Sequence, residues 1–323
     1  MSTRCSLFLW VLALAGLSLA FFAGCKPKQT MNAAADSVSK YAKEMGESAG
    51  KLGTKAGQSL GLVEKKWDYV RLAYGDGEVP AAVQGRYTVA EEREIGRALA
   101  IEWTAKFGCY THEHLERYLN RIAAALAAYS DRPALPATLL VLDTEEYRWF
   151  GAPGGFVLVS LGALRAAESE SEAAACVALA LAHAQLRHAL NLYERIAGGA
   201  LAFEKGAPVE PIRFSAAAEE TAALLVRNGH VAADVRSAAR EATRLLVRLG
   251  YEPGGLKAFV ERTKVRRQAR HPILPADELA YCRTVEEAVA QRLEELHAPA
   301  SGRTLVPRFR RECASCLPIP RSN

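Results

Sequence analysis

The sequence predicts an α+β protein that is mainly helical, with a small β-sheet beside a buried central helix. Three observations support this fold class. Apolar residues recur at helical spacing in most segments after residue 86. Only two short apolar runs, 138–143 and 156–161, are bounded by proline and glycine as strands are. Residues 173–182 are almost wholly apolar within a longer helical segment, 170–196, and a helix that is apolar on all sides is a buried one.

The elements follow one another in a consistent order. Thr88 and Glu91 form a capping-box pattern that predicts the start of a helix. That helix runs through 91–107 and a second through 114–129, which ends at the prolines that precede the first strand. The second strand leads into the central helix. Further helices are expected at 216–227, 231–249, 255–268 and 284–297.

Composition places the chain among globular proteins and excludes some functions. Of its 323 residues, 50% are apolar and 24% are charged, which suits a chain with a sizeable core. The 41 basic and 36 acidic residues leave a net charge of +5, too weak over this length to indicate a nucleic-acid-binding protein. The seven cysteines are too few for a disulfide-built scaffold.

The N-terminus has the layout of a secretory signal. Arg4 precedes an apolar run, 7–22, and small residues follow directly before Cys25. This ending resembles a bacterial lipobox, in which the cysteine carries the lipid, so we expect lipid attachment at Cys25 and a membrane-anchored lipoprotein facing the periplasm. Lys26 favours the outer membrane over the inner. The alternative is a retained transmembrane anchor, although the run is about 16 residues and a span needs roughly 20.

Four regions follow from these patterns. Residues 1–24 are a signal peptide, and residues 25–85 are a flexible or weakly helical spacer in which each of five glycines would cost a helix about 1 kcal/mol. Residues 86–299 form the globular domain. Residues 300–323 are a basic tail that contains a Cys-x-x-Cys pair.

Three segments resemble one enzyme family. They are PGGFVLVSLGAL (153–164), ESEAAACVALALAHAQLRH (170–188) and LVRLGYEP (246–253). Together they resemble the zinc metallopeptidases of family 48, which include CAAX prenyl proteases and periplasmic quality-control proteases of bacteria. The likeness covers about residues 86–297. It implies a metallopeptidase-like domain in which a strand lies along the cleft as a peptide-binding strand. The residues of that strand are Gly155, Phe156, Val157, Leu158 and Val159.

The resemblance fails at the residues that would hold zinc. Family members carry HExxH, which places two histidines on one helical face around a zinc ion, with a glutamate as general base. In this chain His183 falls on the second histidine, Leu179 on the first and Ala180 on the catalytic glutamate. Ser237 falls on the third ligand, a glutamate in the family. We therefore expect no intact catalytic or metal site and no cofactor.

His183 is then the lone remnant, expected to be a hydrogen-bonded core residue. His188 lies five residues further on, about 140° around a continuous helix, so the two are not expected to chelate one ion. His230 or Glu241 could rebuild a different site, but both are expected on solvated helix surfaces. The arginines of VRRQAR (265–270) are expected on a solvated face, with contact to anionic lipid as the alternative.

Three functions remain open at this point. The favoured one is a pseudoprotease: a membrane-tethered envelope lipoprotein that binds an extended polypeptide at its strand edge by β-augmentation, as an adaptor or chaperone. The second is an active, divergent zinc metalloendopeptidase with a rebuilt site, which needs two further ligands near His183. The third is a structural envelope protein that packs against a partner.

The cysteines can be divided by place. Cys5 leaves with the signal, Cys25 is lipidated and Cys176 lies in the buried helix as a free thiol. Four cysteines then remain, an even number that can pair as disulfides in an oxidising compartment. We predict that Cys313 or Cys316 bridges to Cys109 or Cys282 and pins the basic tail to the domain.

Overall fold

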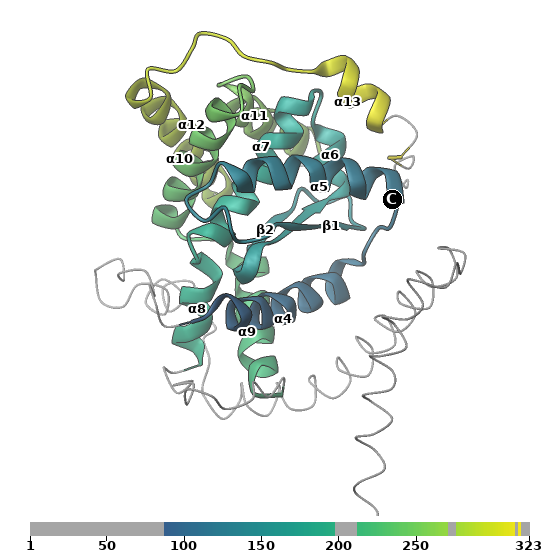
Figure 1. Ribbon diagram of the computed structural model, residues 1–323, viewed down its shortest axis with the longest axis vertical. Coiled ribbons are helices and arrows are strands. Elements are labelled where there is room, and N and C mark those ends of the chain that lie inside the picture. Colours follow the sequence, from purple (N-terminus) through teal and green to yellow (C-terminus); the bar gives the residue numbers. More distant parts are fainter. Residues whose placement is uncertain (1–86, 198–211, 271–275, 314–315, 318–323) are drawn as a thin grey trace, which may run out of the picture. The chain divides into compact units, whose positions relative to one another are not determined.

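The computed structural model describes residues 87–197, 212–270, 276–313 and 316–317, all within one compact unit of the chain. Their fold is mainly helical with one small three-stranded sheet (Figure 1), so the predicted fold class is confirmed. Predictions about the signal peptide, Cys25 and the spacer lie outside the described residues. The helices of this part are α4 (Val89–Phe107), α5 (Glu113–Ala128), α6 (Leu161–Ala166), α7 (Glu170–Gln185), α8 (His188–Ile196), α9 (Ile212–Asn228), α10 (Ala232–Arg248), α11 (Gly255–Arg270), α12 (Ala276–Glu295) and α13 (Val306–Cys313).

The sheet has the strand order β1-β3-β2. Strand β1 (Thr138–Leu142) pairs in parallel with β3 (Phe156–Ser160), and β2 (Trp149–Ala152) pairs antiparallel with β3 on its other side. Both predicted strands are present, while β2 was not predicted because four residues are too few to show an alternating pattern. Strand β3 is the middle strand, and a short 3₁₀ turn (Pro153–Gly155) connects it to β2.

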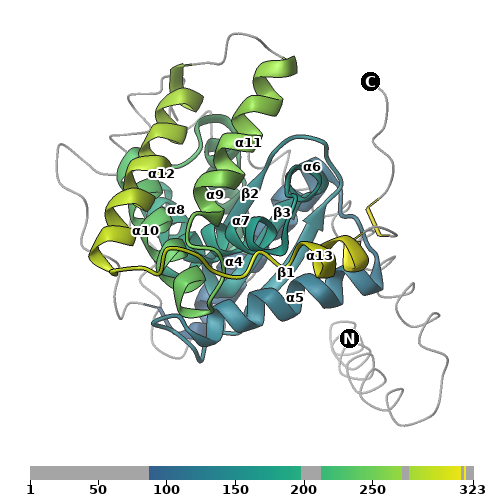
Figure 2. The ribbon, with the colours of Figure 1, turned by 90° about the horizontal axis from the view of Figure 1, so that it is seen from above.

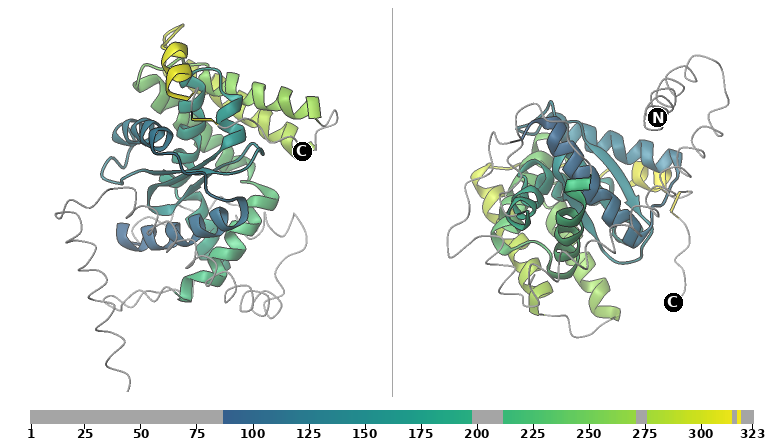
Figure 3. Two further views of the ribbon diagram at one scale, coloured as in Figure 1. Left: turned by 90° about the vertical axis from the view of Figure 1, so that its right-hand side faces the viewer. Right: turned by 90° about the horizontal axis from the view of Figure 1, so that it is seen from below.

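Helices cover both faces of the sheet (Figure 3). Val157 and Val159 of β3 pack in one core cluster with α5 and α7, whereas Phe156 and Leu158 pack in a second cluster with α4, α8 and α9. Alternate residues of a strand point to opposite faces, so the sheet is the middle layer of three. A strand buried on both faces has a continuous apolar sequence, which explains why β3 has the sequence FVLVS without alternating polar residues.

Helix α7 is the buried central helix that the sequence predicts. Every one of its residues is buried. Seen from above, α7 lies at the centre of the described unit, and it contacts α5, α10, α11 and the sheet (Figure 2). Its side chains therefore form much of the larger core cluster, and its two ends are where polar groups are found.

The N-terminus of α4 has the capping box that the sequence predicts. The Glu91 N–H donates to Thr88 Oγ1 (3.3 Å), and the Thr88 N–H donates to Glu91 Oε2 (2.6 Å). These two bonds satisfy backbone groups that would otherwise lack partners in the first turn. The local pattern therefore fixes where α4 begins.

The single helix predicted over 170–196 is two helices. Helix α7 ends at Gln185 and α8 begins at His188, with the axes bent by 43°. Between them Arg187 adopts the left-handed conformation (φ 60°, ψ 27°). That conformation costs a non-glycine residue roughly 1–2 kcal/mol. No glycine or proline marks the break, so the helical pattern alone continues through it.

The C-terminal segment packs against the domain instead of forming a separate tail. The Arg303 N–H donates to the Gly250 carbonyl (3.0 Å), and the Glu252 N–H donates to the Arg303 carbonyl (3.2 Å). Further on, the Arg308 guanidinium of α13 binds the Glu170 carboxylate at the start of α7. The described part of residues 300–317 is thus part of the fold.

Two arginines in the basic stretch of α11 contact other parts of the domain, although they were expected to face solvent. Arg267 donates to the Tyr147 carbonyl (2.9 Å) and lies over the Trp149 ring. Arg266 donates to the Arg165 carbonyl (2.9 Å). The prediction of a purely solvated face is therefore wrong for these two arginines.

No single helix among the described residues is long and apolar enough to cross a membrane. Helices α7 and α8 together meet that test by length and composition. Their bend and the complete burial of α7 are those of a core helix.

Candidate metal centre

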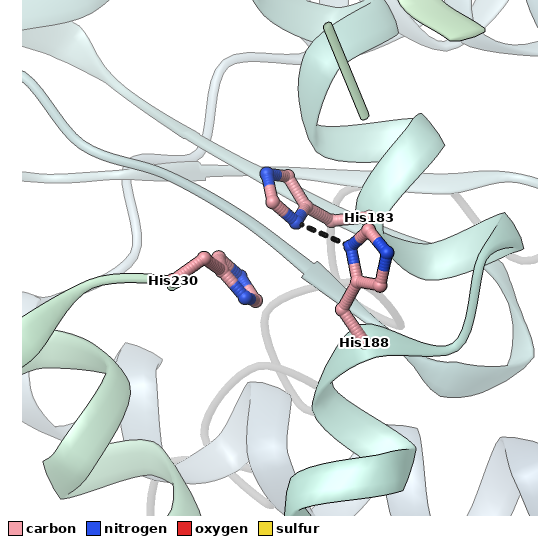
Figure 4. A group of neighbouring side chains, drawn as sticks. All are labelled: His183, His188 and His230. Atoms are coloured by element: carbon pink, nitrogen blue, oxygen red, sulfur yellow. Dashed lines mark hydrogen bonds between the residues drawn. The ribbon is translucent and has the colours of Figure 1, made fainter. Parts of the chain in front are cut away.

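Three histidines meet where three helices begin or end (Figure 4). His183 lies in the last turn of α7, His188 is the first residue of α8, and His230 lies two residues before α10. One ring nitrogen from each histidine lies within 4.8 Å of the others. His183 and His188 are buried, with 2% and 7% of their surface exposed, and 11% of the His230 side chain is exposed.

The closest contact in the group joins His183 to His188. Their Nδ1 atoms are 2.9 Å apart. On the other side of His183, the His230 ring stacks at 3.8 Å between centroids with 19° between the planes. His183 is thus a buried residue with a hydrogen-bond partner, as predicted, but the expectation that it is isolated and that His188 points away from it is wrong.

The helix break explains the error. On a continuous helix the two side chains would point about 140° apart. Because the chain turns at Arg187 and restarts as α8, the His188 ring is redirected towards the end of α7. The break is thus what turns two separated histidines into neighbours.

His230 reaches the group from a turn, not from a solvated helix surface as predicted. Gly229 ends α9 with a positive φ of 68°, and Val231 is extended at the cap of α10. Asn-Gly before a new helix is a recognisable stop signal, which places His230 in a connection but does not show what it faces. Glu241 takes no part, because its carboxylate pairs with Arg244.

Two residues of α10 lie beside ring nitrogens of His188 and His230. Ser237 Oγ lies 3.1 Å from His188 Nε2. Asp234 Oδ1 lies 3.5 Å from the same nitrogen, and Asp234 Oδ2 lies 3.9 Å from His230 Nδ1. The position that the resemblance assigned to the third ligand is therefore at the site, although Ser237 contacts a histidine there. Asp234 was not predicted; its only sequence signal is its place one helical turn after His230.

Burial keeps the two innermost imidazoles neutral. It lowers the pKa of His183 well below the ordinary value, and the nearby His230 and His188 act in the same direction. Burial also lowers the pKa of His188 to about 4, against the opposing effect of Asp234. Neutral imidazole is the form that ligates metals, so these rings offer lone pairs at pH 7 without losing a proton first.

Leu179 and Ala180 offer no ligand, as expected from the sequence. Both are fully buried in α7. The backbone at Ala180 lies so close to β2 that a Cβ on Gly151 would be 2.0 Å from the Ala180 carbonyl oxygen and 3.0 Å from His183 Cβ. The positions at which the resemblance expects a ligand and a general base are therefore closed by packing, and β2 lies directly beside His183.

The predicted peptide-binding strand is not available for a ligand. Residues 156–159 of β3 pair with β1 on one side and β2 on the other, and Gly155 is buried in the turn before them. β-Augmentation needs a free strand edge. The assignment of Gly155–Val159 as the binding strand is therefore wrong, and β2 is the edge strand of the sheet nearest the histidines.

The cysteines in the described part of the chain form no disulfide bond. Cys176 is fully buried, as predicted, and burial raises its pKa. The expected bridge between Cys313 or Cys316 and Cys109 or Cys282 is not formed in this structure. Cys313, Cys316 and Cys282 are buried while Cys109 is exposed.

The donor set fits a transition metal of the zinc type. Catalytic zinc sites use three protein ligands, and three histidines are one such set, with Zn–N distances of about 2.0–2.1 Å. Tetrahedral ligand nitrogens are then roughly 3.3 Å apart, close to the 2.9 Å between the His183 and His188 Nδ1 atoms. Two facing ring nitrogens at this separation share either a proton or a cation.

No protein-family model and no curated protein matches this chain.

Proposed function

We propose that this chain binds one zinc-type ion through His183, His188 and His230, as a metallopeptidase-like protein with a rebuilt metal centre. The observation that carries the proposal is the convergence of three histidine nitrogens within 4.8 Å. It supports the divergent metalloendopeptidase over the pseudoprotease, because His188 and His230 are the two further ligands that the former requires.

The residues around the cluster suit this role. With Nδ1 of His188 facing the ion, its Nε2–H donates towards Ser237 Oγ and Asp234, which fixes the tautomer and the ring orientation. A zinc ion with three protein ligands keeps a position open and acts as a Lewis acid towards a carbonyl group. We therefore propose hydrolysis of an amide or ester as the reaction class.

The substrate that fits best is an extended polypeptide. The family resemblance implies it, and strand β2, an end strand of the sheet, packs against α7 directly beside His183. The lipobox-like ending at Cys25 supports the further proposal that this activity belongs to a lipoprotein tethered to a membrane and facing the periplasm.

Zinc stoichiometry and peptide hydrolysis test the proposal. Purified protein is expected to hold one zinc per chain and to cleave casein until a chelator removes the metal. His183→Ala should lose both, while His114→Ala, an exposed histidine paired with Glu312, should keep both. Absence of stoichiometric zinc overturns the proposal. Zinc without hydrolysis would leave a metal-dependent polypeptide-binding protein.

A second candidate follows from Ser237. Its Oγ is 3.1 Å from His188 Nε2, and His188 Nδ1 is 2.9 Å from His183, so the three residues have the spacing of a nucleophile, a base and an orienting group. This reading needs the opposite tautomer of His188. If it holds, a fluorophosphonate probe labels the metal-free protein and Ser237→Ala abolishes labelling. If zinc is the cofactor, Ser237→Ala retains zinc and the probe leaves the protein unlabelled.

A further inference from the structure

Glu92 of α4 is a buried carboxylate that binds two arginines. Its side chain has no exposed surface. Arg132, after α5, donates to both carboxylate oxygens (3.0 and 2.8 Å). Arg187, between α7 and α8, places its Nη2 2.6 Å from Oε1. The two arginines come from different parts of the chain, so Glu92 links two separate loops to α4.

Arg187 is also the residue whose backbone makes the break before His188. The left-handed position after a helix is usually taken by glycine, which adopts it without strain. Here an arginine occupies it, and its side chain is held by a buried carboxylate. The next residue is His188, whose Nδ1 lies 2.9 Å from that of His183. The ion pair therefore acts at the one backbone turn that brings the two rings together.

We propose that Glu92, through Arg187, is a positioning residue that holds His188 against His183. Its effect on metal affinity rests on the function proposed above, whereas its effect on the two rings does not. Arg132 shares the carboxylate but has no part in the turn. Substituting Arg132 therefore separates the positioning effect of Glu92 on Arg187 from the loss of stability that follows when any buried ion pair is broken.

Four variants test this in the full-length protein. Glu92→Gln removes the charge that holds Arg187, and Arg132→Gln is the matched control that leaves the Glu92–Arg187 pair intact. Arg187→Ala and Arg187→Gly both remove the ion pair, but only glycine takes the left-handed conformation freely. Zinc affinity is measured by competition with a chelating dye. The visible spectrum of the cobalt(II) form reports the ligand geometry, and thermal unfolding confirms that each variant folds.

Glu92→Gln and Arg187→Ala are expected to weaken zinc binding about 10–100-fold and to change the cobalt spectrum. Arg187→Gly and Arg132→Gln should stay within about threefold of the unchanged protein. Equal losses in Arg132→Gln and Glu92→Gln, or equal losses in both Arg187 variants, would overturn the inference.

A metal-free measurement separates this inference from the proposed function. ¹⁵N NMR of the imidazoles should show coupling across the hydrogen bond between the His183 and His188 Nδ1 atoms, and Glu92→Gln should abolish it. If the unchanged protein binds no zinc, the proposed function fails and this coupling alone decides the positioning role. Coupling that persists in Glu92→Gln overturns it.

Discussion

The two ends of helix α7 bury polar groups in opposite ways. At the start, the Glu170 carboxylate is fully buried and accepts hydrogen bonds from the Tyr118 hydroxyl (2.8 Å), the Tyr251 hydroxyl (2.7 Å) and the Arg308 guanidinium. Burial alone would raise the pKa of Glu170, yet the bonds from Arg308, Tyr251 and Tyr118 outweigh it and lower the pKa. Each oxygen has its partners, as a structural buried charge requires.

At the other end, three histidines face one another, and the Asp234 carboxylate lies beside two of them. Burial favours the neutral form of His183 and His188, and two of their nitrogens are 2.9 Å apart. With the histidine cluster as the metal site proposed above, the difference indicates how a structural polar cluster can be told from a binding one. A structural cluster is complete within the fold, whereas a binding cluster collects donors of one kind around a common point.

The largest expected effect comes from a substitution at the start of α7, where the buried Glu170 carboxylate has all its partners. Glu170→Ala should lower the free energy of unfolding by about 3–5 kcal/mol, because it leaves two tyrosine hydroxyls and an arginine without their acceptor. Urea unfolding measures this. Zinc affinity should be unchanged, since the cluster lies at the opposite end of the helix. Glu261→Ala, which removes an exposed pair with Lys257, is the control and should cost less than about 0.5 kcal/mol.

The same carboxylate predicts how stability depends on pH. The folded pKa of Glu170 is lower than its unfolded value. Its contribution is therefore fully present above the unfolded pKa and is lost as the pH falls through the folded pKa. Glu170→Ala should flatten the acid limb of the stability curve. An unchanged acid limb in this variant would contradict the ion pair.

The next largest effect tests the histidine cluster at the end of α7. Zinc at about 100 times its dissociation constant should stabilise the folded protein by about 2.7 kcal/mol, because the ion binds the assembled cluster. Unfolding with and without zinc measures the difference. His230→Ala should show almost none of it. The same zinc-dependent shift in His230→Ala would mean that the ion binds elsewhere.

A smaller effect is expected at Asp234, whose carboxylate lies beside ring nitrogens of His188 and His230. Asp234→Asn should weaken zinc binding about 10–100-fold, because Asp234 orients His188 and His230. Dye competition measures the affinity. Asp131→Asn, at an exposed aspartate that pairs with Arg244, should bind as the unchanged protein does. Equal affinity in both variants would remove Asp234 from the site.

The smallest effect concerns Glu102 of α4, a partly buried carboxylate near Glu219. Burial, and then the charge of Glu219, raise the pKa of Glu102 to about 7. The folded state therefore binds the proton more tightly, and stability should fall as the pH rises from about 4.5 to about 7. Glu102→Gln should remove this slope and stabilise the protein at pH 8 by on the order of 1 kcal/mol after solvent screening. A slope that survives the substitution would exclude Glu102 as its source.

Local patterns were enough to predict the capping box at Thr88, two of the strands and the buried helix α7. Each depends on residues a few positions apart, so the sequence carries the whole signal. The histidine cluster depends on contacts between distant segments. The break at Arg187 is held by Glu92 of another helix, and His230 arrives through a turn after α9. The same limit applies to β3, whose middle position depends on the unpredicted strand β2.

The contact between Arg308 and Glu170 also sets an order of events. Glu170 opens the central helix, but its arginine lies 138 residues further along the chain and is synthesised well after it. Until that segment emerges, the carboxylate has no cation and the helix cannot be buried with its charge paired. The domain is therefore completed only after the chain has been made through Arg308, and a chain cut short before Arg308 should be cleared by proteases as unfinished.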